Sequence, residues 1–206
     1  MDVGVLIYDG FDELDGIGPY EVFDYASRFA EEPIDVSYLT IGPRDRITAS
    51  HGTVLIPDGT LPGPDSNDAL DLLVVPGGGW SDLEADASAR VEARKGDIPE
   101  AIADYHDAGV TIASVCTGGM LLATAGVTDG RRAVTHGSAI DELSATDATV
   151  VHERVVDDGD ILTAGGVTSG IDLALHLVER EIGQSIADRI STVMEYERRS
   201  AAYRAD

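Results

Sequence analysis

The 206-residue sequence has one cysteine, Cys116, one lysine, Lys95, and no apolar run long enough to cross a membrane. A single cysteine excludes an internal disulfide framework and fits a reducing compartment. The first residues have neither the basic stretch nor the apolar core of a signal peptide. We therefore expect a soluble, cytoplasmic protein with no membrane partner.

Basic residues are scarce, because 14 Lys and Arg stand against 38 Asp and Glu, which gives a formal net charge of −24. This charge repels nucleic acids and anionic membranes, so we expect neither as a partner. The acidic residues occur in every segment, which is typical of a halophilic surface whose self-repulsion is relieved by salt. Hydrophobic residues still make up 43% of the chain. The length and this content predict one folded domain over residues 1–206.

Short apolar runs alternate with helical patterns along the chain. Strands are predicted at 3–7, 35–41, 71–75, 110–115 and 132–135, with hairpins at 47–56 and between 149–156 and 161–164. Helices are predicted to begin at Pro19, at Ser81 and just after Cys116. Further helices are predicted at 99–108, 138–143, 169–181 and 185–203, and a loop at 57–68. The alternation indicates an α/β fold with a mostly parallel sheet and helices on both faces.

Cys116 lies between an apolar strand and a helix that opens with small residues. A nucleophile at such a turn is forced outward, beside the unpaired N–H groups of the first helical turn. These amides favour an anion, so we expect them to lower the pKa of the Cys116 thiol. The alternative is a buried structural cysteine. The turn favours a reactive thiol.

Three consecutive glycines, Gly77, Gly78 and Gly79, follow the predicted strand 71–75. Glycines leave backbone amides unshielded, and in a parallel sheet this loop lies at the same edge as Cys116. The N–H of Gly78 or Gly79, together with that of Thr117, is a candidate oxyanion hole. The alternatives are a tight turn or a phosphate loop, and the missing Walker lysine disfavours the latter.

Asp15 and His136 follow other predicted strands at this edge. A carboxyl beside a thiolate would be pushed towards its protonated form and could act as a general acid, although the residues alone favour a helix-entry or solvated aspartate at Asp15. His136 could orient a substrate or relay a proton, or could be structural. The other four histidines fit strand or helix patterns, and without Cys or His clusters we expect no metal site.

Five segments together resemble the ThiJ/PfpI superfamily of the class I glutamine amidotransferase-like fold. They are LDGIGPYEVF at 14–23, VVPGG at 74–78, ASVCTG at 113–118, AVTH at 133–136 and ILTAGG at 161–166. The resemblance covers nearly the whole chain. It implies a flavodoxin-like three-layer sandwich with a nucleophile-elbow cysteine.

Within this superfamily the sequence is most similar to the isocyanide hydratase branch and to the amidotransferase-like domains of AraC-type regulators. The resemblance implies that Cys116 is the nucleophile, Asp15 the acid and Thr117 their neighbour at the elbow. PfpI-type peptidases have histidine where Thr117 stands, which disfavours peptidase activity. Gly137 replaces the tryptophan usual in hydratases, which leaves the substrate open. The sequence lacks the regulators' DNA-binding domain, so we expect no direct transcriptional role.

Three functions remain as hypotheses. The first is a hydratase or lyase that adds water to a small electrophilic substrate such as an isocyanide. The second is a glyoxalase or deglycase acting on 2-oxoaldehydes, with His136 moving protons. The third is a cysteine redox sensor without enzymatic activity. No residue pattern indicates a cofactor, and a homodimer is expected by analogy with the superfamily.

Overall fold

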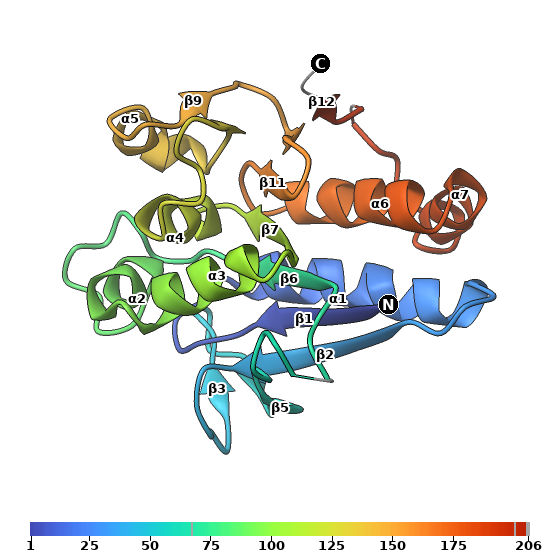
Figure 1. The fold of residues 1–206 in the computed structure, drawn as a ribbon, viewed down its shortest axis with the longest axis horizontal. Coiled ribbons are helices and arrows are strands. Elements are labelled where there is room, and N and C mark those ends of the chain that lie inside the picture. The colour runs from blue at the N-terminus through green and yellow to red at the C-terminus, as the bar shows by residue number, and fades with distance from the viewer. Residues whose placement is uncertain (67, 200, 205–206) are drawn as a thin grey trace.

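Eight strands form the central sheet of the computed structural model, which describes residues 1–66, 68–199 and 201–204 (Figure 1). The sheet order is β12-β10-β11-β7-β6-β1-β2-β5, and every neighbouring pair is parallel except β10 with β11. The strands are β1 (Asp2–Leu6), β2 (Asp35–Thr40), β5 (Gly59–Thr60), β6 (Leu72–Val75), β7 (Thr111–Val115), β10 (Val155–Asp157), β11 (Ile161–Ala164) and β12 (Tyr203–Arg204).

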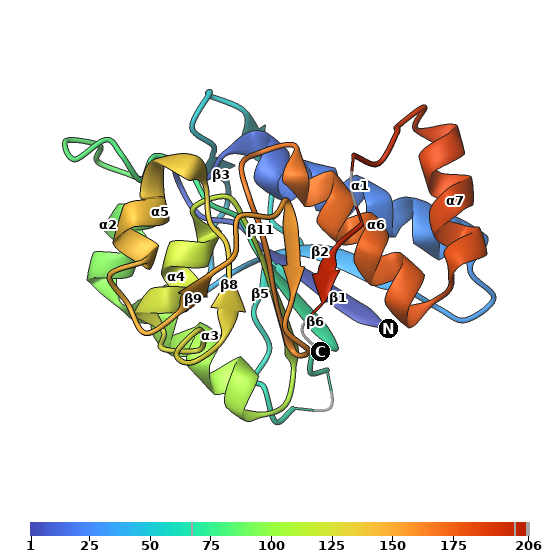
Figure 2. The same cartoon turned by 90° about the horizontal axis from the view of Figure 1, so that it is seen from above.

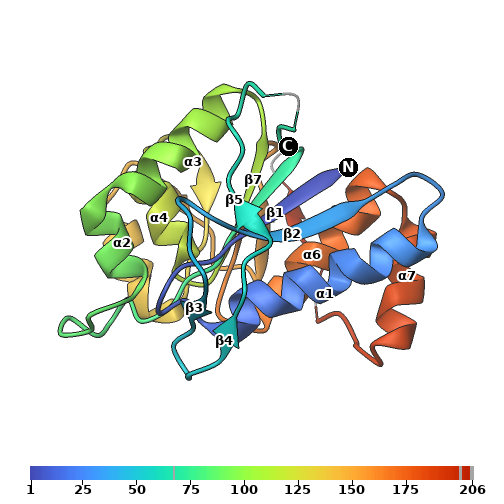
Figure 3. The same cartoon turned by 90° about the horizontal axis from the view of Figure 1, so that it is seen from below.

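Helices cover both faces of this sheet, as Figures 2 and 3 show. One layer contains α1 (Glu13–Phe29), α6 (Ser169–Glu181) and α7 (Gln184–Val193), which pack against one another. The other contains α2 (Ala89–Lys95), α3 (Asp97–Asp107) and α4 (Gly118–Thr124). Strands β1, β6 and β7 are almost wholly buried because helices flank them on both sides. The predicted α/β sandwich is confirmed.

Two small ribbons lie outside the central sheet. The predicted hairpin near Gly52 is confirmed as antiparallel β3 (Ile47–Thr48) and β4 (Val54–Leu55). Strand β8 (Arg132–Ala133) pairs with β9 (Thr149–Val150) and not with the central sheet. The predicted strand at 132–135 is therefore shorter than expected and belongs to a separate ribbon. His136 is followed by the short helices η1 (Gly137–Ala139) and α5 (Ile140–Leu143).

The sequence misplaced several helix and strand limits. Helix α1 begins at Glu13 because Asp12 caps it, so Pro19 lies inside the helix. No helix begins at Ser81; α2 begins at Ala89, where the Ser88 side chain accepts from the Val91 N–H. The last helix ends at Val193 because Glu195 adopts a left-handed φ of 49°. The segment 57–68 includes β5, and only the part of 149–156 from Val155 pairs with β11.

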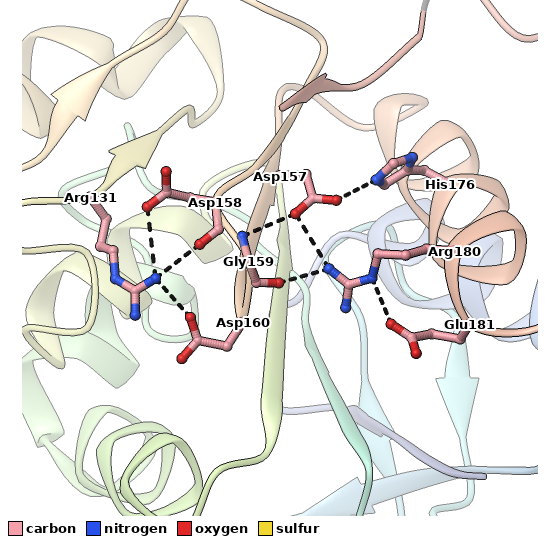
Figure 4. A network of polar contacts seen from close by, with 8 residues as sticks. All are labelled: Arg131, Asp157, Asp158, Gly159, Asp160, His176, Arg180 and Glu181. Atoms are coloured by element: carbon pink, nitrogen blue, oxygen red, sulfur yellow. Dashed lines mark hydrogen bonds and ion pairs between the residues drawn. The ribbon is translucent and has the colours of Figure 1, made fainter. Parts of the chain in front are cut away.

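The turn between β10 and β11 is fastened by a network of polar contacts (Figure 4). Asp157 accepts from Arg180 at 3.3 Å and lies 2.7 Å from Nε2 of the buried His176 on α6. On the other side of the turn, the Arg131 guanidinium lies 2.7 Å from Asp160 Oδ1. This network lies at the amino edge of β11, the edge opposite to the one that follows β7 at Cys116. Among the described residues, no helix combines the length and apolar character needed to span a bilayer.

Candidate active site

The carboxyl ends of four parallel strands bring the site together. Cys116 follows β7, Tyr8 follows β1, the glycine loop follows β6, and segment 165–168 follows β11. Parallel strands place these ends at one edge of the sheet, where ligand sites form. The predicted convergence of the glycine loop with Cys116 is thereby explained by topology.

Cys116 forms the turn between β7 and α4 with a left-handed φ of 58°, which is uncommon for a residue other than glycine. Its N–H donates to the carbonyls of Ala164 (3.1 Å) and Gly165 (2.9 Å). Its own carbonyl accepts from the Thr135 hydroxyl at 2.9 Å. These contacts hold the strained elbow in place. Hydrogen bonding by the backbone N–H groups of Val167 and Thr117 acts to lower the pKa of its thiol.

Asp15 lies in the first turn of α1 and is 0% exposed. Its Oδ2 accepts from the Gly77 N–H at 3.0 Å, whereas Oδ1 has no hydrogen-bond partner among the described residues. Burial, assisted by the charge of Asp12, raises the pKa of Asp15 to about 7, against the opposing effects of the Gly77 N–H and the Cys116 side chain. The structure therefore brings the predicted carboxyl to the thiol, in a form that is partly protonated near neutral pH.

The expectation of a lowered thiol pKa was wrong. Cys116 is only 6% exposed, and burial, reinforced by the Asp15 carboxylate, raises the pKa of its thiol to about 12. The N–H groups of Val167 and Thr117 act in the opposite direction but do not outweigh desolvation. Near neutral pH the thiol is therefore protonated, while the Asp15 carboxyl is partly ionised.

The glycine loop packs flush against the elbow. A Cβ added to Gly77 would lie 2.4 Å from the Thr117 nitrogen and 2.5 Å from its hydroxyl oxygen. The Gly78 N–H donates to that hydroxyl at 2.9 Å, so this amide is already engaged. The prediction that the Gly78 N–H forms part of an oxyanion hole was therefore wrong, because this N–H already donates to the Thr117 hydroxyl. Gly79 is exposed and has a φ of 61°.

His136 reaches the site from the small β8–β9 ribbon. Its Nδ1 accepts from the Ser138 N–H at 3.1 Å and lies 2.8 Å from the Ser138 hydroxyl. In the neutral ring the proton is therefore on Nε2. The imidazole packs on Gly166, where an added Cβ would lie 2.6 Å from Cδ2. His136 thus borders segment 165–168, whose Gly165 carbonyl accepts the Cys116 N–H.

Two site residues were missed by sequence reasoning. Val167 contributes only a backbone N–H, which carries no signature in the sequence. Tyr8 is 5% exposed, and its hydroxyl donates to the Pro76 carbonyl at 2.8 Å, next to the glycine loop. Burial, together with the charges of Asp15 and Cys116, raises the pKa of Tyr8. Its position directly after β1 was the available signal.

Within residues 1–66, 68–199 and 201–204, no group of three or more His, Cys, Asp or Glu side chains is arranged to hold a metal ion.

The pattern of the DJ-1/PfpI family matches residues 1–180. The chain belongs to this family. Among DJ-1/PfpI relatives, isonitrile hydratase from Pseudomonas putida is 32% identical over 95% of this chain and 78% of its own length. The HTH-type transcriptional regulator CdhR from Pseudomonas aeruginosa is 31% identical over 93% of this chain, which spans 54% of the regulator.

Solved structures agree with this family membership. A ThiJ/PfpI family protein from Pseudomonas syringae has a TM-score of 0.81 and 26% identity, over 95% of this chain and 75% of its own. An AraC family transcriptional regulator from Pseudomonas putida has a TM-score of 0.78 at 21% identity, over 94% and 98% of the two chains, and shows the shared fold. The family thus includes an enzyme and regulators on one architecture.

Proposed function

We propose that this protein is a cysteine-dependent enzyme that adds water to a small electrophile, with an isonitrile as the substrate class. The observation that carries the proposal is the buried pair of Asp15 and Cys116, in which one carboxyl oxygen has no hydrogen-bond partner. A buried oxygen of this kind is costly unless it exchanges a proton or contacts a ligand. The similarity to isonitrile hydratase supports the substrate class.

In the first step the Cys116 sulfur attacks the terminal carbon of the isonitrile R–N≡C. The thiol proton passes to Asp15, which delivers it to the same carbon. A carbon–sulfur and a carbon–hydrogen bond form, and the product is the thioimidate R–N=CH–S–Cys116. The N–H groups of Val167 and Thr117 stabilise negative charge on the sulfur while it loses its proton.

In the second step water adds to the thioimidate carbon. Asp15 takes one proton from the water as the carbon–oxygen bond forms, and the second proton of the water passes to the substrate nitrogen. The carbon–sulfur bond then breaks, and Asp15 returns its proton to the sulfur. The sum is R–NC plus H₂O giving the formamide R–NH–CHO. A carboxyl whose pKa is about 7 suits this work, because it both accepts and donates near neutral pH.

The environment of the thiol disfavours the sensor hypothesis. Redox-sensing cysteines combine exposure with thiolate character, because the thiolate is the species that peroxide oxidises. Cys116 is buried and its pKa is raised. The same features suit a thiol that ionises only when substrate is bound and Asp15 can take its proton.

The test is hydration of an aryl isonitrile, followed by formamide formation in NMR spectra, with methylglyoxal as the parallel substrate. We expect formamide from the native protein, a thioimidate adduct on Cys116 in intact-mass spectra, and neither in Cys116→Ala. Cys116→Ser is the matched control for shape, because it keeps a hydroxyl but lacks the nucleophilic thiol. Turnover of methylglyoxal alone would instead favour the glyoxalase. No turnover of either, with peroxide altering partner binding, would favour the sensor.

We also propose that the protein acts as a homodimer on a small-molecule substrate, by analogy with its family. Light scattering at the salt concentration of the assay tests this proposal, and a monomer with full activity would contradict it.

A further inference from the structure

Segment 165–168, which joins β11 to α6, touches Cys116 at two points. The Gly165 carbonyl accepts the Cys116 N–H at 2.9 Å, and hydrogen bonding by the Val167 N–H acts to lower the pKa of the thiol. Val167 has a φ of 38°, in the left-handed region that β-branched residues rarely adopt. Such a conformation persists only where the surrounding structure holds it. The neighbours of this segment therefore decide where the Val167 N–H points.

Arg154, just before β10, holds this segment at both ends. Its carbonyl accepts the Gly165 N–H at 3.0 Å. Its guanidinium donates to the Thr168 hydroxyl at 2.9 Å and forms an ion pair with Asp172 on α6. The backbone of Arg154 thus holds the start of the segment, and its side chain connects the end of the segment to the helix after it.

Asp172 anchors the arrangement in the protein interior. It is 1% exposed, and besides Arg154 its Oδ2 accepts from the Tyr196 hydroxyl at 2.8 Å. Its Oδ1 accepts from the Arg199 N–H at 3.4 Å. The chain beyond α7 is thereby tied to the same carboxylate. A buried charge with several partners has one favoured geometry, because any displacement breaks its hydrogen bonds and leaves the charge unpaired in the interior.

We propose that Arg154 is a positioning residue for the Cys116 site: it fixes segment 165–168, whose Gly165 carbonyl accepts the Cys116 N–H, and thereby holds the nucleophile elbow and the adjoining Val167 backbone in place. The side chain of Arg154 contacts Thr168, Asp172 and Tyr196, so it acts on the thiol through the segment. Its part in turnover rests on the proposed function, whereas its effect on the thiol does not.

The experiment uses two variants, Thr168→Val and Arg154→Lys. Thr168 makes no capping hydrogen bond to α6, so valine removes only the contact with Arg154. Lysine can still pair with Asp172 through its ammonium group. It lacks the planar guanidinium, so it cannot donate to Asp172 and to the Thr168 hydroxyl in the same geometry. Cys116 is the only cysteine, so iodoacetamide alkylation reports on it alone.

We expect alkylation at pH 8 to slow by about tenfold in both variants, the effect of losing one charge-assisted donor to the thiolate. In isonitrile hydration kcat should fall while KM changes little, because the lost contact serves the sulfur and not the substrate. Thermal unfolding of each variant verifies that it is folded under the assay conditions.

Arg131→Lys is the matched control. Arg131 pairs with Asp160 at the turn of the β10–β11 hairpin (Figure 4). This turn precedes β11, whereas segment 165–168 follows the other end of that strand. In Arg131→Lys, Cys116 should be alkylated at the native rate. Native alkylation rates in both test variants, or an equal slowing in Arg131→Lys, would overturn the proposal. If the native protein hydrates no isonitrile, the proposed function fails, while the alkylation rates still decide the role of Arg154.

Discussion

The Thr117 hydroxyl accepts the N–H of Gly78 at 2.9 Å, with both residues buried. This bond ties the loop after β6 to the elbow after β7, across 39 residues of sequence. The neighbouring Gly77 N–H donates to Asp15 at 3.0 Å. Two consecutive amides of one loop therefore fix the residue beside the nucleophile and the acid that faces it.

Replacing Thr117 by valine should destabilise the protein and impair the site. Valine has nearly the same shape but offers no acceptor, so the buried Gly78 N–H loses its partner at a cost of about 1–3 kcal/mol. Thr117→Ser keeps the hydroxyl and is the matched control. Denaturant unfolding should separate the two variants by this amount. Equal unfolding free energies for serine and valine would show that the bond contributes nothing.

Alanine at Gly77 should abolish activity. Its methyl group would lie 2.4 Å from the Thr117 nitrogen, so the loop must move away from the elbow. That movement breaks the Asp15 and Thr117 contacts together. Gly42→Ala is the control, since a Cβ there meets nothing within 4 Å. Isonitrile turnover and the alkylation rate of Cys116 measure the effect, and an active Gly77→Ala enzyme would contradict the close packing described above.

Much of the fold could be predicted because its signals are local. The apolar run, the cysteine and the small residues after it specify the elbow within about ten positions of each other, and α4 begins at Gly118 as the pattern indicates. Helix α1 was placed too late because proline is common at a first helical position. Here Asp12 caps the helix earlier, and Pro19 is accommodated in its interior.

The failures arose where distant segments decide the outcome. Residues 81–88 do not continue into a helix from Ser81, because Gly10 lies against the Ala87 backbone and the Ala89 N–H donates to Gly78. After α7 the chain turns at Glu195, and the Tyr196 hydroxyl donates to Asp172. The thiol pKa was misjudged for the same reason. Nearby amides can be inferred from sequence, whereas the depth of burial that outweighs them cannot.

Stability should rise with salt. The 38 acidic and 14 basic residues leave a net charge of −24, and most ion pairs here involve exposed partners that contribute little. Screening therefore weakens more repulsion than attraction, and the Debye length falls from about 10 Å at 0.1 M to about 3 Å at 1 M. Thermal unfolding between 0.1 and 1 M KCl should show Tm increasing. A flat or falling Tm would mean that the acidic surface is not self-repulsive.

Replacing Asp15 by asparagine should stabilise the protein at alkaline pH while removing activity. The pKa of Asp15 is raised from 3.8 to about 7, so its favourable contribution is complete below pH 3.8 and is lost as the pH rises through 7. At about 1.4 kcal/mol per tenfold change, ionising it inside the fold costs on the order of 4 kcal/mol. Asparagine keeps an oxygen for the Gly77 N–H and carries no charge.

The difference in unfolding free energy between Asp15→Asn and the native protein should therefore be large at pH 8 and vanish near pH 4. At pH 8 we expect Tm to rise by roughly 10 °C, from the usual relation between unfolding free energy and Tm for a chain of this size. Glu21→Gln, an exposed carboxylate on the same helix, controls for the change in net charge and should give little difference at either pH. A gain in Tm that does not depend on pH, or one that Glu21→Gln also shows, would mean that the destabilising ionisation is not that of Asp15. The predicted pattern would mean that the fold tolerates a costly carboxylate beside Cys116, the expected signature of a group retained for proton transfer.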